Sequence, residues 1–228
     1  MLQRLKVKTM RYYPIYLDIQ NRNCLVVGGG GVGTRKVIML LNCGANVTVV
    51  SPDLSEQLAK LEGSPGLILK QRTYQSADLE EMFLVIGATD DETLNRQISR
   101  DAEQRSTLCN IADRPEICNF ILPSIVQRED LVITISTSGK SPALAKKLRK
   151  TLEARFGEEY SVLLRLMGAI RKKLLNQSHE PEAHKPVFER LINSDLTALI
   201  KEGKTAEINT LLFDILGDGY RFEELVGS

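Results

Sequence analysis

Apolar residues follow two alternating spacings over the first half of the chain. Short continuous apolar runs, typical of strands buried on both faces of a sheet, occur at residues 25–28, 46–50, 67–69, 83–87 and 107–111. Apolar residues between these runs recur at helical spacing and predict helices at residues 32–43, 54–61 and 92–105. Strands that alternate with helices predict an α/β protein with a parallel sheet. Residues 14–19 are expected to add an edge strand.

The first strand ends in a run of glycines from which the first helix begins. Gly28, Gly30 and Gly33 fit the G-x-G-x-x-G template. In a dinucleotide site the first glycine permits the turn, the second lets the backbone approach a pyrophosphate and the third brings the helix close to the strand. The helix N-terminus then favours a phosphate. The alternative is a glycine-rich turn without a ligand.

The pattern changes after Asp113. Strand-like segments at residues 119–121, 125–128 and 131–136 follow one another without helices, which indicates an antiparallel meander or arm. Ser141 and Pro142 then supply an N-cap and a first-turn proline, and the remaining sequence has a helical pattern. We therefore predict three parts: a Rossmann-like NAD-binding domain at 1–115, a β connector for dimerisation at 116–140 and a helical C-terminal domain at 141–228.

Composition narrows the classes of function. The 30 Lys and Arg residues balance the 29 Asp and Glu residues, for a net charge of +1, which argues against a general nucleic-acid binder. No apolar run approaches the roughly 18 residues of a membrane span, and residues 1–8 lack the apolar stretch of a signal peptide. The four cysteines form no C-x-x-C pair. We expect them to be reduced core residues of a cytoplasmic protein without a metal site.

Candidate ligand-binding residues follow the second and fourth predicted strands. Asp53 either binds the adenosine ribose or caps a helix that begins at Leu54. No arginine nearby would receive a 2′-phosphate, which favours NAD over NADP. Thr89 and Asp90 either line the cofactor cleft or form a turn and N-cap before the helix at Glu92.

Further candidates come later in the chain. Asp113 follows the fifth predicted strand, where a carboxylate is either a general base beside a hydride acceptor or an ordinary loop residue. His179 and His184 have no third ligand nearby and are interpreted as loop residues. A basic cluster forms either a solvated helix face or an anion-attracting wall; its members are Lys140, Lys146, Lys147, Arg149 and Lys150.

Several motifs in the same order resemble the precorrin-2 dehydrogenase family, the dehydrogenase part of siroheme synthase. They are Tyr13 to Leu17, the glycine turn from Gly28 to Lys36, Ala88 to Asp91, Asn110 to Asp113, Phe120 to Ser124 and Ser136 to Pro142. The resemblance covers residues 14–156, and beyond Phe156 only the helical character is similar. It implies NAD-dependent oxidation of precorrin-2 to sirohydrochlorin, on the way to siroheme or cobalamin, by a homodimer whose β connector is exchanged between subunits.

The resemblance also implies roles for single residues. Asp113 takes the position of the family's essential aspartate. The positions associated with NAD contact are Gly31, Val32, Pro52 and Asp53. Thr137 replaces a serine that some relatives carry near the substrate pocket, and Asn110 belongs to the same motif as Asp113. Because precorrin-2 is a polycarboxylate, Lys140, Lys146 and Lys147 gain a candidate partner.

Two other functions stay open at this point. Some relatives also insert ferrous iron into sirohydrochlorin, so one alternative is a bifunctional dehydrogenase and ferrochelatase. The other is a module that senses NAD(H) without catalysis. The methyltransferase that is fused to some siroheme synthases is not expected, since the sequence stops at Ser228.

Overall fold

The chain divides into two compact units. The computed structural model describes residues 11–177 and 184–227, and the units are Met1–Leu122 and Pro123–Ser228. Each unit has its own core and is described by itself. No helix in the described ranges is long and apolar enough to cross a membrane. The division into three parts at residues 115 and 140 stays a prediction.

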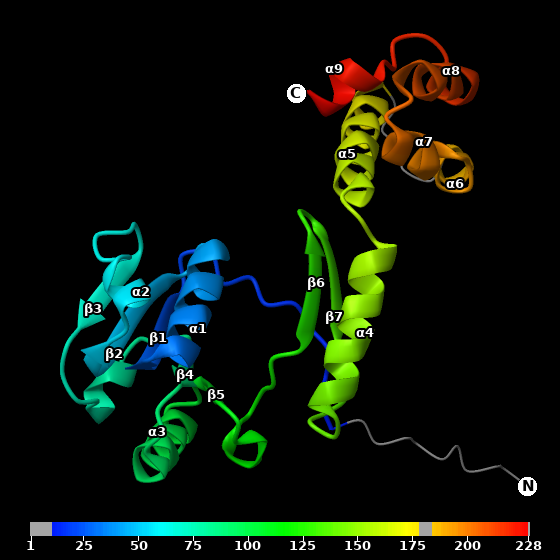
Figure 1. Ribbon diagram of the computed structural model, residues 1–228. Helices are drawn as coiled ribbons and strands as arrows, with labels where there is room; N and C mark the ends of the chain where they lie inside the picture. The colour runs from blue at the N-terminus through cyan, green and yellow to red at the C-terminus, as the bar shows by residue number, and fades with distance from the viewer. Residues whose placement is uncertain (1–10, 178–183, 228) are drawn as a thin grey trace, which may run out of the picture. The chain divides into compact units, whose positions relative to one another are not determined.

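The first unit is a five-stranded parallel sheet with the strand order β3-β2-β1-β4-β5 (Figure 1). The strands are β1 (Asn23–Gly29), β2 (Asn46–Leu54), β3 (Leu67–Lys70), β4 (Leu84–Gly87) and β5 (Leu108–Ile111). The connecting helices are α1 (Gly31–Asn42), α2 (Glu56–Ala59), α3 (Glu92–Gln104) and the short 3₁₀ turns η1 (Ser76–Leu79) and η2 (Pro115–Ile117). The chain moves outward from β1 to β3 and then returns to β4 beside β1. The carboxyl ends of β1 and β4 therefore form the topological switch point at which such sheets bind ligands.

Both faces of the sheet are covered, which explains why its strands read as continuous apolar runs. Cys24 and Val26 of β1 belong to one core cluster, together with Val37 of α1. Leu25 and Val27 alternate with them and belong to the opposite cluster, which also contains α3 residues. The α/β fold predicted from the sequence is confirmed.

Residues 14–19 do not form the predicted edge strand. β1 already pairs with β2 on one side and β4 on the other, so no edge beside it is free. Tyr13, Ile15 and Tyr16 are 84, 58 and 69% exposed. The alternating apolar pattern at residues 14–19 therefore does not lead to pairing with β1.

Residues 119–121 are also not a strand, although Asn119 lies along the edge of β5. Its amide N–H donates to the carbonyl of Cys109 (3.1 Å), and its side-chain oxygen accepts from the Cys109 N–H (2.7 Å). Its side-chain NH₂ group donates to the carbonyl of Thr107 (3.0 Å). One backbone and two side-chain hydrogen bonds of Asn119 thus take the place of a full strand ladder, and they protect the exposed edge of the sheet.

The second unit joins a β-hairpin to a set of helices. The antiparallel strands β6 (Ser124–Arg128) and β7 (Leu131–Ile135) confirm the other two predicted segments after Asp113. The helices are α4 (Pro142–Arg155), α5 (Glu159–Gln177), α6 (Lys185–Ile192), α7 (Leu196–Glu202), α8 (Thr205–Leu216) and α9 (Phe222–Val226).

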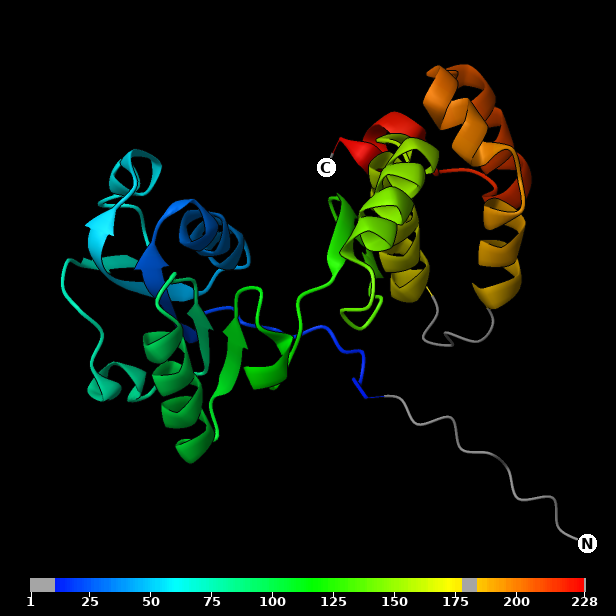
Figure 2. The same cartoon turned by 60° about the horizontal axis from the view of Figure 1, so that its bottom comes forward.

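The helices from α5 onward enclose a separate apolar core (Figure 2). Leu166 and Ile170 of α5, Leu196 of α7 and Leu212 of α8 have 0% exposure. Gly157, Gly203 and Gly217 lie between helices. His179 lies outside the described residues.

Candidate functional site

The glycine turn between β1 and α1 is defined by two close contacts and one open position. Gly28 has a φ of 111°, and a Cβ there would collide with the carbonyl oxygen of Ala88. A Cβ on Gly33 would collide with the carbonyl oxygen of Gly28, so α1 lies directly against the end of β1. A Cβ on Gly30 would meet no atom within 4 Å. The first and third glycines are therefore required by packing, whereas the space at Gly30 is available to a ligand.

The start of α1 is suited to an anion. Gly30 is the N-cap residue, with an extended backbone (φ −73°, ψ −175°), and it has no side chain with which to cap the helix. The first turn holds no acidic residue. Gly31 and Val32 lie at its exposed surface. The backbone N–H groups of this turn and the positive end of the helix dipole therefore face outward at the switch point.

Ser51 holds the end of β2 against this turn. Its hydroxyl accepts the Gly29 N–H (2.9 Å) and donates to the carbonyl of Asp53 (2.7 Å). The strand continues to Leu54, and Ser55 caps α2 by accepting the Leu58 N–H (3.2 Å). The alternative in which Asp53 caps a helix from Leu54 is therefore wrong.

Pro52 and Asp53 both have exposed side chains at the carboxyl end of β2. That end borders the glycine turn, because Leu54 pairs with Gly29. The carboxylate of Asp53 is thus available to a ligand bound at the turn.

The end of β4 is organised by a residue that sequence analysis did not identify. Asn95 of α3 is 5% exposed. It donates to the Thr89 carbonyl (2.9 Å) and accepts from the Thr89 hydroxyl (3.0 Å). Asp91 is the N-cap of α3 and accepts the N–H groups of Thr93 and Leu94. Neither Thr89 nor Asp90 is therefore the N-cap of this helix. The side chain of Asp90 stays exposed.

Asp113 lies in a left-handed turn directly after β5. Its φ is 59° and its side chain is exposed. Three residues earlier, Asn110 of β5 is 9% exposed, and its side chain donates to the carbonyl of Phe120 (3.0 Å). Asn110 therefore fastens the loop after β5, which limits how far its amide group can turn toward a substrate.

A cation that interacts electrostatically with Asp113 was not identified from the sequence. Lys36 lies on α1 and is partly buried. Burial and the neighbouring Arg35 lower the pKa of Lys36, whereas the charge of Asp113 opposes this effect. A positive and a negative side chain from α1 and the β5 turn are thus electrostatically coupled at the carboxyl end of the sheet.

The remaining predicted substrate residues belong to the second unit. The Thr137 hydroxyl accepts the Ser141 N–H (3.1 Å), and the Thr137 carbonyl accepts the Lys140 N–H (3.0 Å). Lys140, Lys146 and Lys147 are exposed. The predicted cofactor residues, Asn110 and Asp113 are therefore in one unit, and Thr137 with the lysines is in the other.

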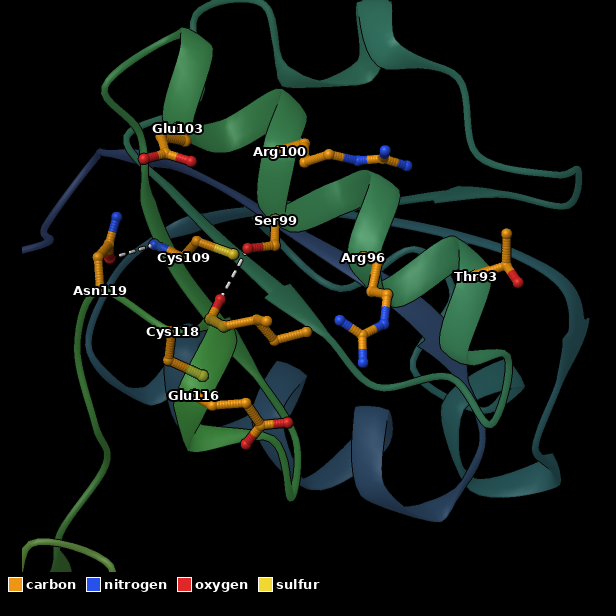
Figure 3. A pocket seen from close by; sticks show the side chains of 10 residues that line it. Thr93, Arg96, Ser99, Arg100, Glu103, Cys109, Glu116, Cys118 and Asn119 are labelled. Carbon is orange, nitrogen blue, oxygen red and sulfur yellow. Dashed lines mark hydrogen bonds between the residues drawn. The ribbon is translucent and has the colours of Figure 1, made fainter.

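A surface pocket of about 530 Å³ lies between α3 and the segment 116–119, beside Cys109 of β5 (Figure 3). Its walls include Arg96 and Ser99 of α3 and Cys118. The Ser99 hydroxyl donates to the Ile117 carbonyl (2.8 Å). None of the predicted site residues lines this pocket, so it is separate from the candidate site.

Comparison with known proteins agrees with this geometry. A family model described as "Putative NAD(P)-binding" matches residues 15–124, and one described as "Sirohaem biosynthesis protein central" matches residues 128–155. The siroheme synthase of Thioalkalivibrio sulfidiphilus is 38% identical over 195 residues, which are 86% of this chain and 40% of that protein. The siroheme synthase of Nitrosococcus oceani is 35% identical over 223 residues, with 96 and 48% covered.

The chain is similar to siroheme synthases and corresponds to their dehydrogenase part. It spans less than half of the length of these curated relatives. A solved structure named "SirC, precorrin-2 dehydrogenase" superposes with a TM-score of 0.72 at 26% identity. The superposition covers 87% of this chain and 100% of that one, so the likeness extends over both units.

The residues of the first unit fit the NAD cofactor that the family implies. The match to the NAD(P)-binding family includes every predicted cofactor residue and Asp113. The open position at Gly30 fits a pyrophosphate, and the exposed carboxylate of Asp53 fits a ribose with free hydroxyl groups. The individual contacts remain predictions.

We expect Gly30→Val to weaken NAD binding roughly tenfold or more while the fold is kept, because its side chain would enter open space where a pyrophosphate is expected. NADH titration by fluorescence and the thermal unfolding temperature measure the two effects. Gly33→Val is the contrasting variant, since its side chain would collide with Gly28 and lower the unfolding temperature. Unchanged NADH affinity in folded Gly30→Val would refute the assignment.

We expect NADH to bind more tightly than NADPH, because Asp53 would repel a 2′-phosphate. Asp53→Ser should bring the two dissociation constants closer together. Glu62→Ser removes an equal charge from an exposed position before β3 and should leave their ratio unchanged. An Asp53→Ser protein with the wild-type ratio would show that Asp53 does not contact the ribose.

Proposed function

We propose that the protein is a precorrin-2 dehydrogenase that converts precorrin-2 to sirohydrochlorin with NAD, within siroheme or cobalamin biosynthesis. The observation that carries this proposal is the structural similarity to the protein named "SirC, precorrin-2 dehydrogenase", whose whole chain is covered by the superposition. The glycine turn, Asp53 and Asp113 supply the separate parts that this chemistry requires, at the carboxyl end of one sheet. The siroheme synthase relatives support the same pathway.

Dehydrogenation removes a hydride and a proton from precorrin-2. NAD, when bound, is the hydride acceptor and leaves as NADH. Residues at the start of α1 would hold its pyrophosphate, and Asp53 would hold the ribose. The carboxylate of Asp113, exposed after β5, would take the proton at one of its oxygens.

The substrate carries several carboxylates, so cations near Asp113 support the proposal. Lys36 places an ammonium group in the electrostatic range of Asp113. We propose that Lys36 attracts a substrate carboxylate and that the exposed Lys140, Lys146 and Lys147 do the same from the second unit. Asn110 and Thr137 would then act mainly by shaping the loops that they fasten.

We further propose that the protein acts as a homodimer in the cytoplasm and binds neither nucleic acid nor membranes. The hairpin β6–β7 is a sheet of two strands within the described residues, and such a sheet needs other elements to be stable. Leu144 and Leu148 of α4, the helix that packs on this hairpin, are 47 and 40% exposed. They form one apolar face at a spacing of four residues, which a second copy would cover.

Light scattering at micromolar protein concentration should give the mass of a dimer. The double variant Leu144→Glu, Leu148→Glu should give a monomer, because charged side chains oppose burial at an apolar interface. Phe213→Glu, which changes an exposed apolar residue of α8, serves as the control and should stay dimeric. A wild-type monomer would refute the proposed assembly.

The proposed base is tested by Asp113→Asn, which keeps the shape of the side chain and removes its basicity. Turnover of precorrin-2 with NAD, followed anaerobically by absorbance, should fall roughly 10²–10⁴-fold. NADH binding should be unchanged. Asp214→Asn on α8 removes an exposed carboxylate from the other unit and should retain full turnover.

Three outcomes bear on the proposed function. Absence of precorrin-2 oxidation by the wild-type protein would refute the dehydrogenase and leave a module that only binds NAD(H). Full activity of Asp113→Asn would refute the base role alone. Formation of siroheme on addition of ferrous ion, without a separate chelatase, would extend the function to the bifunctional enzyme.

A further inference from the structure

Cys118 occupies an unusual place at the edge of the sheet. β5 is an edge strand, and its N–H groups at Cys109 and Ile111 have side-chain acceptors. Asn119 accepts the first of these N–H groups (2.7 Å), and the sulfur of Cys118 accepts the second (3.1 Å). Ile111 is 2% exposed, so its N–H would otherwise be buried without an acceptor, which is unfavourable.

The same sulfur also bonds to the far side of the Asp113 turn. The Cys118 thiol lies 3.1 Å from the carbonyl oxygen of Arg114 and 3.4 Å from that of Ile111. A thiol has one proton, which it donates to one of these carbonyls at a time. Cys118 thus links the residues that precede and follow Asp113.

Other hydrogen bonds fix the turn on either side of this link. Asp113 has a φ of 59°, a left-handed conformation that is unfavourable for an aspartate unless its surroundings hold it. The Ala112 N–H is fixed by the carbonyl of Gly87 (2.8 Å), and the Arg114 N–H bonds to the carbonyl of Ile111 (3.2 Å). On the other side of the turn, Ser99 holds the carbonyl of Ile117 (Figure 3). Cys118 connects these two anchored ends.

We infer that Cys118 is a positioning residue for dehydrogenation: its thiol holds the turn that aims the carboxylate of Asp113 at the substrate. This inference rests on the proposed function for its effect on turnover. Its structural part, the hydrogen bond from the Ile111 N–H to the Cys118 sulfur, can be tested without substrate. Burial and a nearby acidic residue raise the pKa of Cys118, which is consistent with a protonated thiol that serves as donor and acceptor.

The main test compares Cys118→Ala, Cys118→Ser and Cys109→Ala. Cys118→Ala should lower kcat roughly ten- to a hundredfold, since small misplacements of a catalytic group reduce turnover by such factors, with the KM for NAD unchanged. Cys118→Ser should recover most of the activity, because a hydroxyl can also accept and donate. Cys109→Ala removes a buried thiol from the same pocket without removing a bond to the turn, and it should keep the wild-type kcat.

A double-mutant cycle separates positioning from a general structural effect. If Cys118 acts through Asp113, Cys118→Ala should change single-turnover rates little once Asp113→Asn is present. An equal loss in both backgrounds would refute the inference. So would a loss of kcat in Cys109→Ala as large as that in Cys118→Ala.

Amide hydrogen exchange provides the readout that does not depend on activity. The Ile111 amide should exchange faster in Cys118→Ala than in wild type or Cys109→Ala. If the wild-type protein does not oxidise precorrin-2, the proposed function fails, while this exchange experiment still decides whether the thiol holds the turn. Unchanged exchange at Ile111 would refute the inference whatever the activity.

Discussion

The contact between Gly33 of α1 and the carbonyl oxygen of Gly28 is the constraint on which the first unit depends. A Cβ on Gly33 would collide with the backbone of Gly28, so the helix can lie against the strand only when that side chain is absent. This contact places the N-terminus of α1 over the carboxyl ends of β1 and β4, where the strand order reverses. The candidate site is built around that one helix end.

Side-chain hydrogen bonds, rather than backbone hydrogen bonds between strands, hold the segments at the ends of three strands. Ser51 bonds the end of β2 to Gly29, Asn95 bonds the loop after β4 at Thr89, and Cys118 bonds the turn after β5. Ser51 and Asn95 are 6 and 5% exposed. Hydrogen bonds to such buried groups hold a loop in one geometry, which prepares a site before its ligand arrives.

This arrangement explains which features could be predicted from the sequence. Continuous apolar runs and a glycine template are local signals, so the sheet, α1 and the place of Gly30 were predictable. The bonds from Asn95 to Thr89 and from Cys118 to Ile111 join residues six and seven positions apart, yet each depends on a tertiary fold that brings α3 or the loop after β5 into place. No spacing rule distinguishes these residues from an ordinary helix asparagine or a core cysteine.

The predicted strand at 14–19, which is absent, and the alternative of a helix cap at Asp53, which the structure excludes, also reflect the limits of local sequence signals. An apolar pattern at 14–19 carries no information on whether a sheet edge is free, and both edges of β1 are occupied. Asp53 resembles a helix cap because serine, proline and aspartate often precede helices. The Ser51 hydroxyl bonds instead to Gly29, and β2 continues to Leu54, so α2 begins at Glu56, after the N-cap Ser55.

Net charge proved a weaker guide to ligands than the local distribution of charge. A net charge of +1 says little about the ligand once the positions of the individual charged residues are known. Lys36 is partly buried and feels the negative charge of Asp113, while Lys140, Lys146 and Lys147 are exposed in the second unit. Burial makes the charge of Lys36 costly unless an anion is near. Asp113 is itself exposed, and its negative charge partly offsets the cost of burying that ammonium group.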